Sequence, residues 1–409
     1  MTLLPHLLRR GAIALAAVAL GLALLPASAG ATGQSWALVS TPNVGNGANA
    51  LNGIDCPSTT MCVAVGASFV SGHYVTLIQS WDGTMWTVVP SPNQGNGDNT
   101  LSAVSCTSTT QCTAVGTTSA NGSSTLVEMW TGTSWSVVPS PNVVGATNKL
   151  VAVSCPSDTS CVAVGVATTG GVDAPIAELW DGSTWSMLVS PTASAYSNSF
   201  DDVSCVSSTM CMAVGSYFDG SRFATLIEQW DGSAWTILPS PNPTPGFAGF
   251  MGVSCTSTTA CMAAGQFSGV GHTLTLFESW DGTTWTVIPG ADLPGGENYL
   301  SGISCTSATA CTAAGFAFDG SNFVTLIDQW NGTTWTIVPS PNDGTLGSFF
   351  NTVSCTSADG CVAVGYSSTN ASNITLVEQS IDTTPPTTST TVGPTTTSAA
   401  DPVVPAFTG

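Results

Sequence analysis

A repeat of about fifty residues is the feature that most restricts how this chain can fold. Its cysteines form seven pairs, and the first cysteine of each pair follows the preceding one by 49 or 50 residues. Self-similarity at this period is typical of solenoids and propellers. Each unit holds four β-type runs of about five to seven residues, separated by turn residues. Four strands in each unit therefore predict an all-β, seven-bladed β-propeller with four antiparallel strands per blade.

The two ends of the repeat array do not match, and the mismatch predicts how the ring closes. Six units end in a complete hairpin of third and fourth strands, but the seventh stops after Thr375–Ser380. A segment resembling the missing fourth strand, Trp36–Asn43, stands alone before the first unit. We therefore predict that this N-terminal strand pairs with the third strand of the last unit. That pairing would leave no sheet edge exposed at the junction.

The ends of the chain differ in composition from the repeats and divide it into three parts. Residues 1–29 resemble a signal peptide: Arg9 and Arg10 precede an apolar stretch at 11–25 and small residues at 27–29. The apolar stretch is shorter than the roughly 20 residues that cross a bilayer, although an uncleaved anchor is the alternative. Residues 30–382 form the predicted propeller. Residues 383–409 contain ten threonines and five prolines and are expected to stay extended, either as a stalk that reaches the cell envelope or as a plain tail.

The charge of the chain excludes several classes of partner. The full chain has a formal charge of −20, which becomes −22 once Arg9 and Arg10 leave with the leader. Lys149 and Arg222 are then the only basic residues besides histidine. Because nucleic-acid binding typically uses about 6–10 cationic contacts to phosphates, we expect no nucleic-acid partner. We expect a secreted, extracellular monomer, in some settings bound to the cell envelope, with no transmembrane span in the mature chain.

The cysteine spacing predicts structural disulfides. Each pair has five residues between its members and brackets the turn between the first two strands of a unit. Cross-strand neighbours lie within the distance that a disulfide needs, and an exported chain can form such bonds. Zinc is the competing interpretation, but the pairs belong to different blades and few histidines could complete a site. The predicted bridges are Cys56–Cys62, Cys106–Cys112, Cys155–Cys161, Cys205–Cys211, Cys255–Cys261, Cys305–Cys311 and Cys355–Cys361.

A Trp-Asp-Gly motif recurs at the hairpin between the third and fourth strands. In the fifth unit it reads Ser279-Trp-Asp-Gly-Thr-Thr-Trp285. Asp-Gly between two β runs is a strong turn signal, and the two tryptophans are expected to pack between blades. The motif resembles the Asp-box of sialidase-like propellers, and the unit is also similar to secreted bacterial tryptophan- and cysteine-rich propeller repeats and, more distantly, to kelch repeats.

The resemblance implies the fold and not the chemistry. Sialidases grip a substrate carboxylate with an arginine cluster, and the mature chain keeps Arg222 alone. Calcium binding by the motif aspartates is an alternative to a turn role, but Thr131 and Asn331 replace aspartate in two units. No Asp-x-Asp-x-Asp run is present. We expect no metal and no cofactor.

The loops of one propeller face vary between units and carry most of the aromatic side chains. This face holds the second hairpins and the connections between blades, whereas the other face repeats its cysteine and Trp-Asp-Gly hairpins. Loops on a rigid scaffold commonly carry specificity. The alternative is that pairs such as Phe218/Phe223 and Phe318/Phe323 are only cross-strand contacts. The candidate ligand-binding residues are Tyr196, Tyr217, Phe218, Phe247, Tyr299, Phe318 and Tyr366.

These observations favour an extracellular, non-catalytic binding or scaffolding propeller. Aromatic loops with Asn, Asp and Ser suit a glycan or another cell-envelope polymer, and a platform for an extracellular protein is a further possibility. The sequence lacks the Gly-x-Ser-x-Gly, phosphate-loop and His-Glu-x-x-His motifs. The alternative is a carbohydrate-active enzyme, a glycosidase or lyase, that pairs Asp201 or Asp202 with Glu297.

Overall fold

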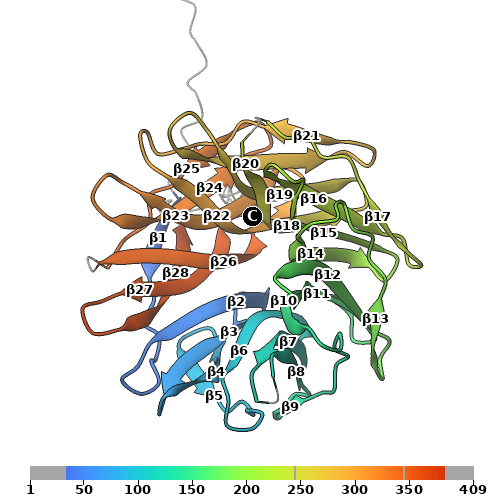
Figure 1. Ribbon diagram of the computed structural model, residues 1–409. Helices are drawn as coiled ribbons and strands as arrows, with labels where there is room; N and C mark the ends of the chain where they lie inside the picture. The colour runs from blue at the N-terminus through green and yellow to red at the C-terminus, as the bar shows by residue number, and fades with distance from the viewer. Residues whose placement is uncertain (1–33, 121, 244–245, 344–345, 383–409) are drawn as a thin grey trace, which may run out of the picture.

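The computed structural model describes residues 34–120, 122–243, 246–343 and 346–382. The predicted signal peptide and the predicted Thr/Pro-rich tail lie outside these residues. The described residues form 28 β-strands arranged as blades around a central axis (Figure 1). The prediction of an all-β propeller is confirmed.

Each blade runs from an innermost strand at the axis to a short strand at the rim. The innermost strands are β2 (Asn49–Ser58), β6 (Asn99–Ser108), β10 (Thr147–Ser157), β14 (Asn198–Ser207), β18 (Ala248–Ser257), β22 (Asn298–Ser307) and β26 (Gly347–Ser357). The second strands are β3 (Met61–Val70), β7 (Gln111–Thr118), β11 (Ser160–Thr169), β15 (Met210–Phe218), β19 (Ala260–Ser268), β23 (Ala310–Phe318) and β27 (Gly360–Ser368). The third strands are β4 (His73–Trp81), β8 (Ser124–Trp130), β12 (Val172–Trp180), β16 (Phe223–Trp230), β20 (Thr273–Trp280), β24 (Phe323–Trp330) and β28 (Asn373–Asp382). The rim strands are β5 (Trp86–Val89), β9 (Trp135–Val137), β13 (Trp185–Leu188), β17 (Trp235–Ile237), β21 (Trp285–Ile288), β25 (Trp335–Ile337) and β1 (Gln34–Leu38).

The innermost strands are longer than predicted. They span 10 or 11 residues, whereas the sequence suggested about five to seven. The reason is that the antiparallel ladder continues past the cysteines, as far as the pair Ser207–Met210 in blade 4. The cysteines therefore lie inside the strands and not at their ends.

Blades 1 to 5 are separate four-stranded sheets, and blades 6 and 7 join into one eight-stranded sheet. A parallel bridge between Phe323 of β24 and Gly347 of β26 makes this connection. It brings the second hairpin of blade 6 against the innermost strand of blade 7.

The N-terminal strand closes the ring, as predicted. Strand β1 pairs antiparallel with β28, with Trp36 opposite Ser380 and the Val39 amide donating to the Val377 carbonyl at 2.9 Å. In Figure 1 the blue β1 lies beside the red β28. Several further contacts join blade 7 to blade 1. The Cys56 amide donates to Ser354 Oγ at 3.1 Å, the Asn351 side-chain amide donates to the Leu51 carbonyl at 2.8 Å, and the Thr41 hydroxyl contacts the side-chain oxygen of Gln79.

The hydrophobic core lies between blades. Each apolar cluster combines residues from two neighbours; one contains Val65 and Ile78 of blade 1 together with Leu101 and Trp135 of blade 2. Because both faces of a blade are covered, the second strands are buried almost continuously. The paired tryptophans contact each other across the third hairpin and belong to these clusters, for example Trp280 and Trp285 with ring centroids 5.7 Å apart.

The cysteines form the seven predicted disulfides, and none is free. The Cα atoms of each pair lie 3.9 to 4.0 Å apart, closer than the cross-strand spacing of about 4.5–5.5 Å on which the prediction rested. The zinc interpretation is therefore not needed.

The Trp-Asp-Gly segments are turns held by their aspartate. Asp281 Oδ1 accepts hydrogen bonds from the amides of Thr283 and Thr284, each at 2.8 Å, and Gly282 has a φ of +97°. Asn331 accepts the equivalent bonds in blade 6. In the part of the chain that the structure describes, no three His, Cys, Asp or Glu side chains gather as a metal site. The motif thus has a role within its own hairpin.

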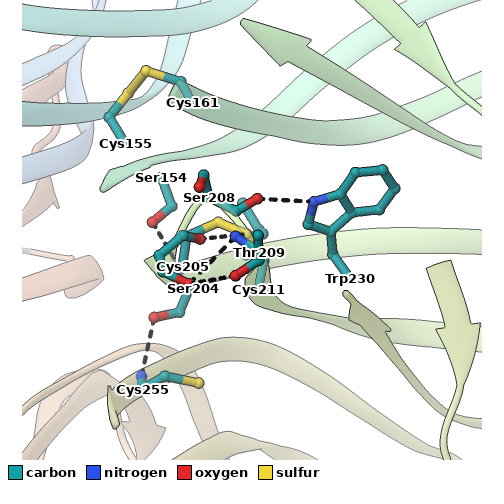
Figure 2. Close-up of a disulfide and its surroundings, with 12 residues drawn as sticks. Ser154, Cys155, Cys161, Ser204, Cys205, Ser208, Thr209, Cys211, Trp230 and Cys255 are labelled. Atoms are coloured by element: carbon teal, nitrogen blue, oxygen red, sulfur yellow. Dashed lines mark hydrogen bonds between the residues drawn. A yellow bond between two sulfur atoms is a disulfide. The ribbon is translucent and has the colours of Figure 1, made fainter. Parts of the chain in front are cut away.

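Hydroxyl groups join neighbouring blades near the disulfides (Figure 2). Ser154 Oγ accepts a hydrogen bond from the Cys205 amide, and Ser204 Oγ accepts one from the Cys255 amide, both at 3.0 Å. The same bond recurs around the ring, so that each blade is tied to the next at its inner strand. Blade 1 carries Asp55 at this position, and its carboxylate accepts from the Cys106 amide at 2.6 Å.

Candidate functional site

A central channel of about 300 Å³ runs along the axis and is lined by all seven innermost strands. A β-bulge interrupts each of these strands, as between Phe200 and Asp202, and leaves one residue without a partner on the second strand. The unpaired residues all line the channel, and they differ from blade to blade: Asn52, Ser102, Val151, Asp201, Met251, Ser301 and Asn351. The bulge therefore provides variable positions inside a repeated strand.

The channel is acidic on two sides. Asp55 of blade 1 and Asp201 and Asp202 of blade 4 line it. Burial raises the pKa of Asp55 and of Asp201 to about 6 and the pKa of Asp202 to about 7. Lys149 acts against this shift at Asp201, because its positive charge favours the ionised carboxylate. These three carboxyl groups therefore titrate closer to neutral pH than an exposed aspartate does.

Asp202 and Glu297, two of the acids suggested for a carbohydrate-active enzyme, make hydrogen bonds to different segments. The Asp202 carboxylate accepts hydrogen bonds from the amides of Val203 and Val253, both at 2.8 Å, and so links blade 4 to blade 5. Glu297 lies outside the channel wall, and its carboxylate accepts from the Thr273 amide at 2.7 Å. Asp202 thus contacts the innermost strand of blade 5, and Glu297 contacts the first residue of β20.

Aromatic rings gather on the variable face at the boundary between blades 6 and 7. Tyr299 stacks on Phe316 with ring centroids 5.0 Å apart, and Phe349 stacks on Tyr366 at 4.9 Å. Phe316 and Phe349 lie edge to face at 5.0 Å and join the two stacks. We call this group, with Phe318 and Phe323 of the second hairpin, the aromatic strip; its members are Tyr299, Phe316, Phe318, Phe323, Phe349 and Tyr366.

The strip runs outward from the rim of the channel. Tyr299 and Phe349 belong to innermost strands, each two residues before a channel-lining residue. Phe318 and Phe323 face each other at the tip of the second hairpin of blade 6. All six rings are partly accessible, and Phe323 is 37% exposed. A ligand on this face could touch the strip and the channel mouth at once.

A second aromatic row follows the boundary between blades 4 and 5. Tyr196 contacts Phe218 at 5.7 Å, Phe218 contacts Phe223 at 5.2 Å, and Phe223 contacts Phe247 at 6.0 Å. Phe218 and Phe223 are directly opposite in the ladder, as are Phe318 and Phe323. The interpretation of these pairs as cross-strand contacts is thus confirmed, although the pairs also extend into larger surface groups.

The structure brings most of the predicted aromatic residues together, but in two places. Tyr196, Phe218 and Phe247 belong to the row, whereas Tyr299, Phe318 and Tyr366 belong to the strip. Tyr217 belongs to neither, because it packs against the apolar cluster between blades 3 and 4.

Sequence reasoning missed the residues that connect the strip, Phe316 and Phe349. The register places Phe349 beside Tyr366 and Tyr299 beside Phe316. The sequence did contain a sign of this group. Tyr299 and Phe349 occupy the same position of the repeat, six residues before the first cysteine of the unit. The other units carry small or polar residues or Lys149 at this position.

A small pocket of about 200 Å³ adjoins the channel mouth at blades 7, 1 and 2. Asn49, Asn52, Tyr74, Thr100 and Asn373 contribute to its wall. Tyr74 is 39% exposed and lies edge to face with Phe69 at 5.1 Å. Asn52 lines both the pocket and the channel, so the two lie side by side.

No family model matches the chain, and no curated protein matches it. Solved structures with a similar fold are numerous, with 277 matching chains. One is described as YCF48 bound to D1 peptide; the likeness covers 85% of this chain and 96% of that one, with a TM-score of 0.52 and 14% sequence identity. At this identity the likeness supports the propeller fold alone. No helix among the described residues is long and apolar enough to span a membrane.

Proposed function

We propose that this protein is a non-catalytic binding propeller that holds a glycan or another envelope polymer on its variable face. The aromatic strip is the observation that carries the proposal. Its six rings are partly accessible, lie across a blade boundary and lead to the channel mouth. By comparison, Phe350 and Phe277 lie in the core and have no exposed surface.

The charge around the strip favours a ligand without acidic groups. Glu297, Asp319 and Asp343 lie on loops next to it. The two basic residues of the propeller are elsewhere: Arg222 lies 3.5 Å from Asp219 in blade 4, and Lys149 is on blade 3. Because like charges repel, a polyanion would be disfavoured on this face, whereas neutral sugar rings can stack on aromatic rings and bond to Asn and Ser.

A protein segment is the second candidate ligand. The similar propeller is described as bound to a peptide, and accessible aromatic rings are common anchors for polypeptides. A neutral or basic segment would fit the same charge argument. Secretion remains part of the proposal, and the seven disulfides agree with an oxidising compartment.

Binding by immobilised protein tests the proposal. The probes are soluble neutral oligosaccharides, isolated envelope polymer and a library of unstructured peptides. We expect the Phe323→Ala and Tyr299→Ala variants to weaken binding of the polymer about tenfold or more, which corresponds to about 1.4 kcal/mol. Val287→Ala is the matched control, because Val287 is 36% exposed on rim strand β21, away from the strip.

Each outcome has a clear meaning. Loss of binding in both strip variants, with the control unchanged, supports the proposal, and the class of probe bound decides between glycan and peptide. Equal binding by all variants would place the ligand elsewhere. A well-folded wild-type protein that binds none of the probes would remove the proposal.

A further inference from the structure

The face opposite the aromatic strip also contains a cleft, between blades 6 and 7. Its volume is about 300 Å³, similar to that of the central channel. One wall consists of the first hairpin and the third turn of blade 6, including Thr309, Trp330 and Asn331. The first hairpin of blade 7, with Ala358 and Asp359, forms the other wall.

A small residue keeps this cleft open. The residue before the second cysteine in blade 6 is Ala310, and it lines the cleft together with Trp330 of the third strand. Blade 4 carries Met210 at this position, which is 5% exposed and packs in the cluster between blades 4 and 5. Blade 5 carries Ala260, and a smaller cleft of about 130 Å³ follows it at the boundary with blade 6.

The blade 7 wall of the larger cleft differs from the corresponding hairpin of the other blades, because blade 7 closes the ring. Blades 1 to 6 have a threonine two residues before the second cysteine, such as Thr309, which lies against Gly332 of the Asn331-Gly332 turn. Blade 7 has no such turn, because its rim strand comes from the N-terminus. At this position it carries Asp359, which lines the cleft.

The chemistry of the walls resembles that of a sugar site. The Trp330 indole is half-buried and held in place by a hydrogen bond from Nε1 to the Ala308 carbonyl at 3.2 Å. Around it stand hydroxyl, amide and carboxylate side chains: Thr306, Thr309, Gln329, Asn331, Thr336 and Asp359. An aromatic surface for ring stacking with polar groups at its edge can orient a pyranose, and about 300 Å³ is at the small end of ligand pockets.

We propose that the cleft between blades 6 and 7 binds a single neutral or amino sugar ring, with Trp330 as the stacking surface and Asp359 as a hydrogen-bond acceptor. The acidic wall disfavours sugars with a carboxylate or phosphate. The site is separate from the aromatic strip, because it lies on the opposite face. It therefore extends the proposed function and does not depend on it.

Filling the cleft tests the assignment. Ala310→Met introduces the residue that blade 4 uses at the same position, so the fold has a precedent for it. Titration of the full propeller with neutral, amino and acidic monosaccharides, followed by tryptophan fluorescence and NMR, measures binding. We expect Ala310→Met to weaken binding of neutral sugars about tenfold or more, and Asp359→Thr to weaken that of amino sugars most.

Two control variants test whether the effect is specific to this cleft. Ala260→Met fills the smaller cleft and is expected to leave binding unchanged. Val287→Ala changes an exposed side chain that lines neither cleft, and it is also expected to leave monosaccharide binding unchanged. The assignment is overturned if the wild-type protein binds no monosaccharide, or if Ala310→Met and Asp359→Thr both bind normally.

Discussion

At the scale of single residues, a serine hydroxyl determines how one blade is attached to the next. The residue before the first cysteine of each unit is serine in six blades and Asp55 in the other. Its side-chain oxygen accepts the hydrogen bond of a cysteine amide in the following blade, as Ser204 does for Cys255 at 3.0 Å. Without that oxygen the amide, which lies between packed blades, loses its partner.

We expect Ser204→Ala to lower the free energy of unfolding by about 1–2 kcal/mol, since an amide between packed blades loses its acceptor. Urea unfolding followed by fluorescence measures the change. Ser208→Ala is the control: Ser208 is exposed on the hairpin, and the bond it makes to Trp230 uses its backbone carbonyl. The control is expected to stay within about 0.5 kcal/mol of wild type. Equal stability of both variants would show that the hydroxyl bond adds nothing.

At the scale of elements, the five residues of β1 complete a blade whose other strands lie more than three hundred residues later in the chain. Trp36 is 5% exposed and packs in a cluster with Ala314 and Ile327 of blade 6 and Phe350 of blade 7. A strand this short gains little from its own ladder. The tryptophan therefore accounts for most of its attachment.

Trp36→Ala is expected to lower the free energy of unfolding by about 3–5 kcal/mol and to expose the edge of β28. Thermal unfolding together with light scattering measures both effects. Leu38→Ala provides the comparison within the same strand, since Leu38 is 47% exposed and should change stability by no more than about 0.5 kcal/mol. A Trp36→Ala protein as stable as the control would show that the ring does not depend on this strand.

At the scale of the whole molecule, a buried carboxylate recurs at most blade junctions. Glu278 on β20 has no exposed surface and accepts a hydrogen bond from Ser240 of the preceding blade at 3.0 Å. Burial raises the pKa of Glu128, Glu178 and Glu228 to about 7 and the pKa of Glu278 and Glu378 to about 8. Blade 1 uses the neutral Gln79 at this position, and blade 6 uses Asp328, whose preceding blade carries Gly290 in place of serine.

These groups predict that the protein is more stable in mild acid than in mild base. The folded state holds their protons more tightly than the unfolded state, in which a glutamate has its usual pKa of about 4.5. The stabilisation that these protonated groups contribute is therefore fully present below about pH 4.5. It is lost as the pH rises through about 7 to 8. We expect the Tm to be higher at about pH 5 than at about pH 8.5, by about 5 °C or more. A Tm that rises with pH across this range would contradict the prediction.

The Glu278→Gln variant tests whether the buried carboxyl groups cause the change of Tm with pH. The variant places in blade 5 the amide that blade 1 already uses as Gln79. Because an amide does not titrate, the difference in Tm between the two pH values should be smaller than in the wild-type protein. The aspartates of the Asp-Gly turns do not interfere, since hydrogen bonds lower the pKa of Asp281 to about 2 and its titration falls below this range.

The repeat determined the fold, because each unit carries the same strand and turn pattern. The cysteine spacing, the Asp-Gly turns and the unmatched Trp36 segment depend only on neighbours in sequence and on the count of units, so they could be read without coordinates. The aromatic loops were also visible, and Tyr299, Phe318 and Tyr366 were correctly placed on one face.

Tertiary structure alone decided what lies between the blades. The bulge that turns Asp201 and Asn351 into the channel depends on a second strand with one residue fewer, and a propensity pattern does not show such a mismatch. Phe316 and Phe349 meet because two blades come together at a boundary, and Ala310 leaves a cleft only because the neighbouring blade supplies its far wall. Contacts between units about fifty residues apart arise from the packing of neighbouring blades, and a sequence read one unit at a time does not contain them.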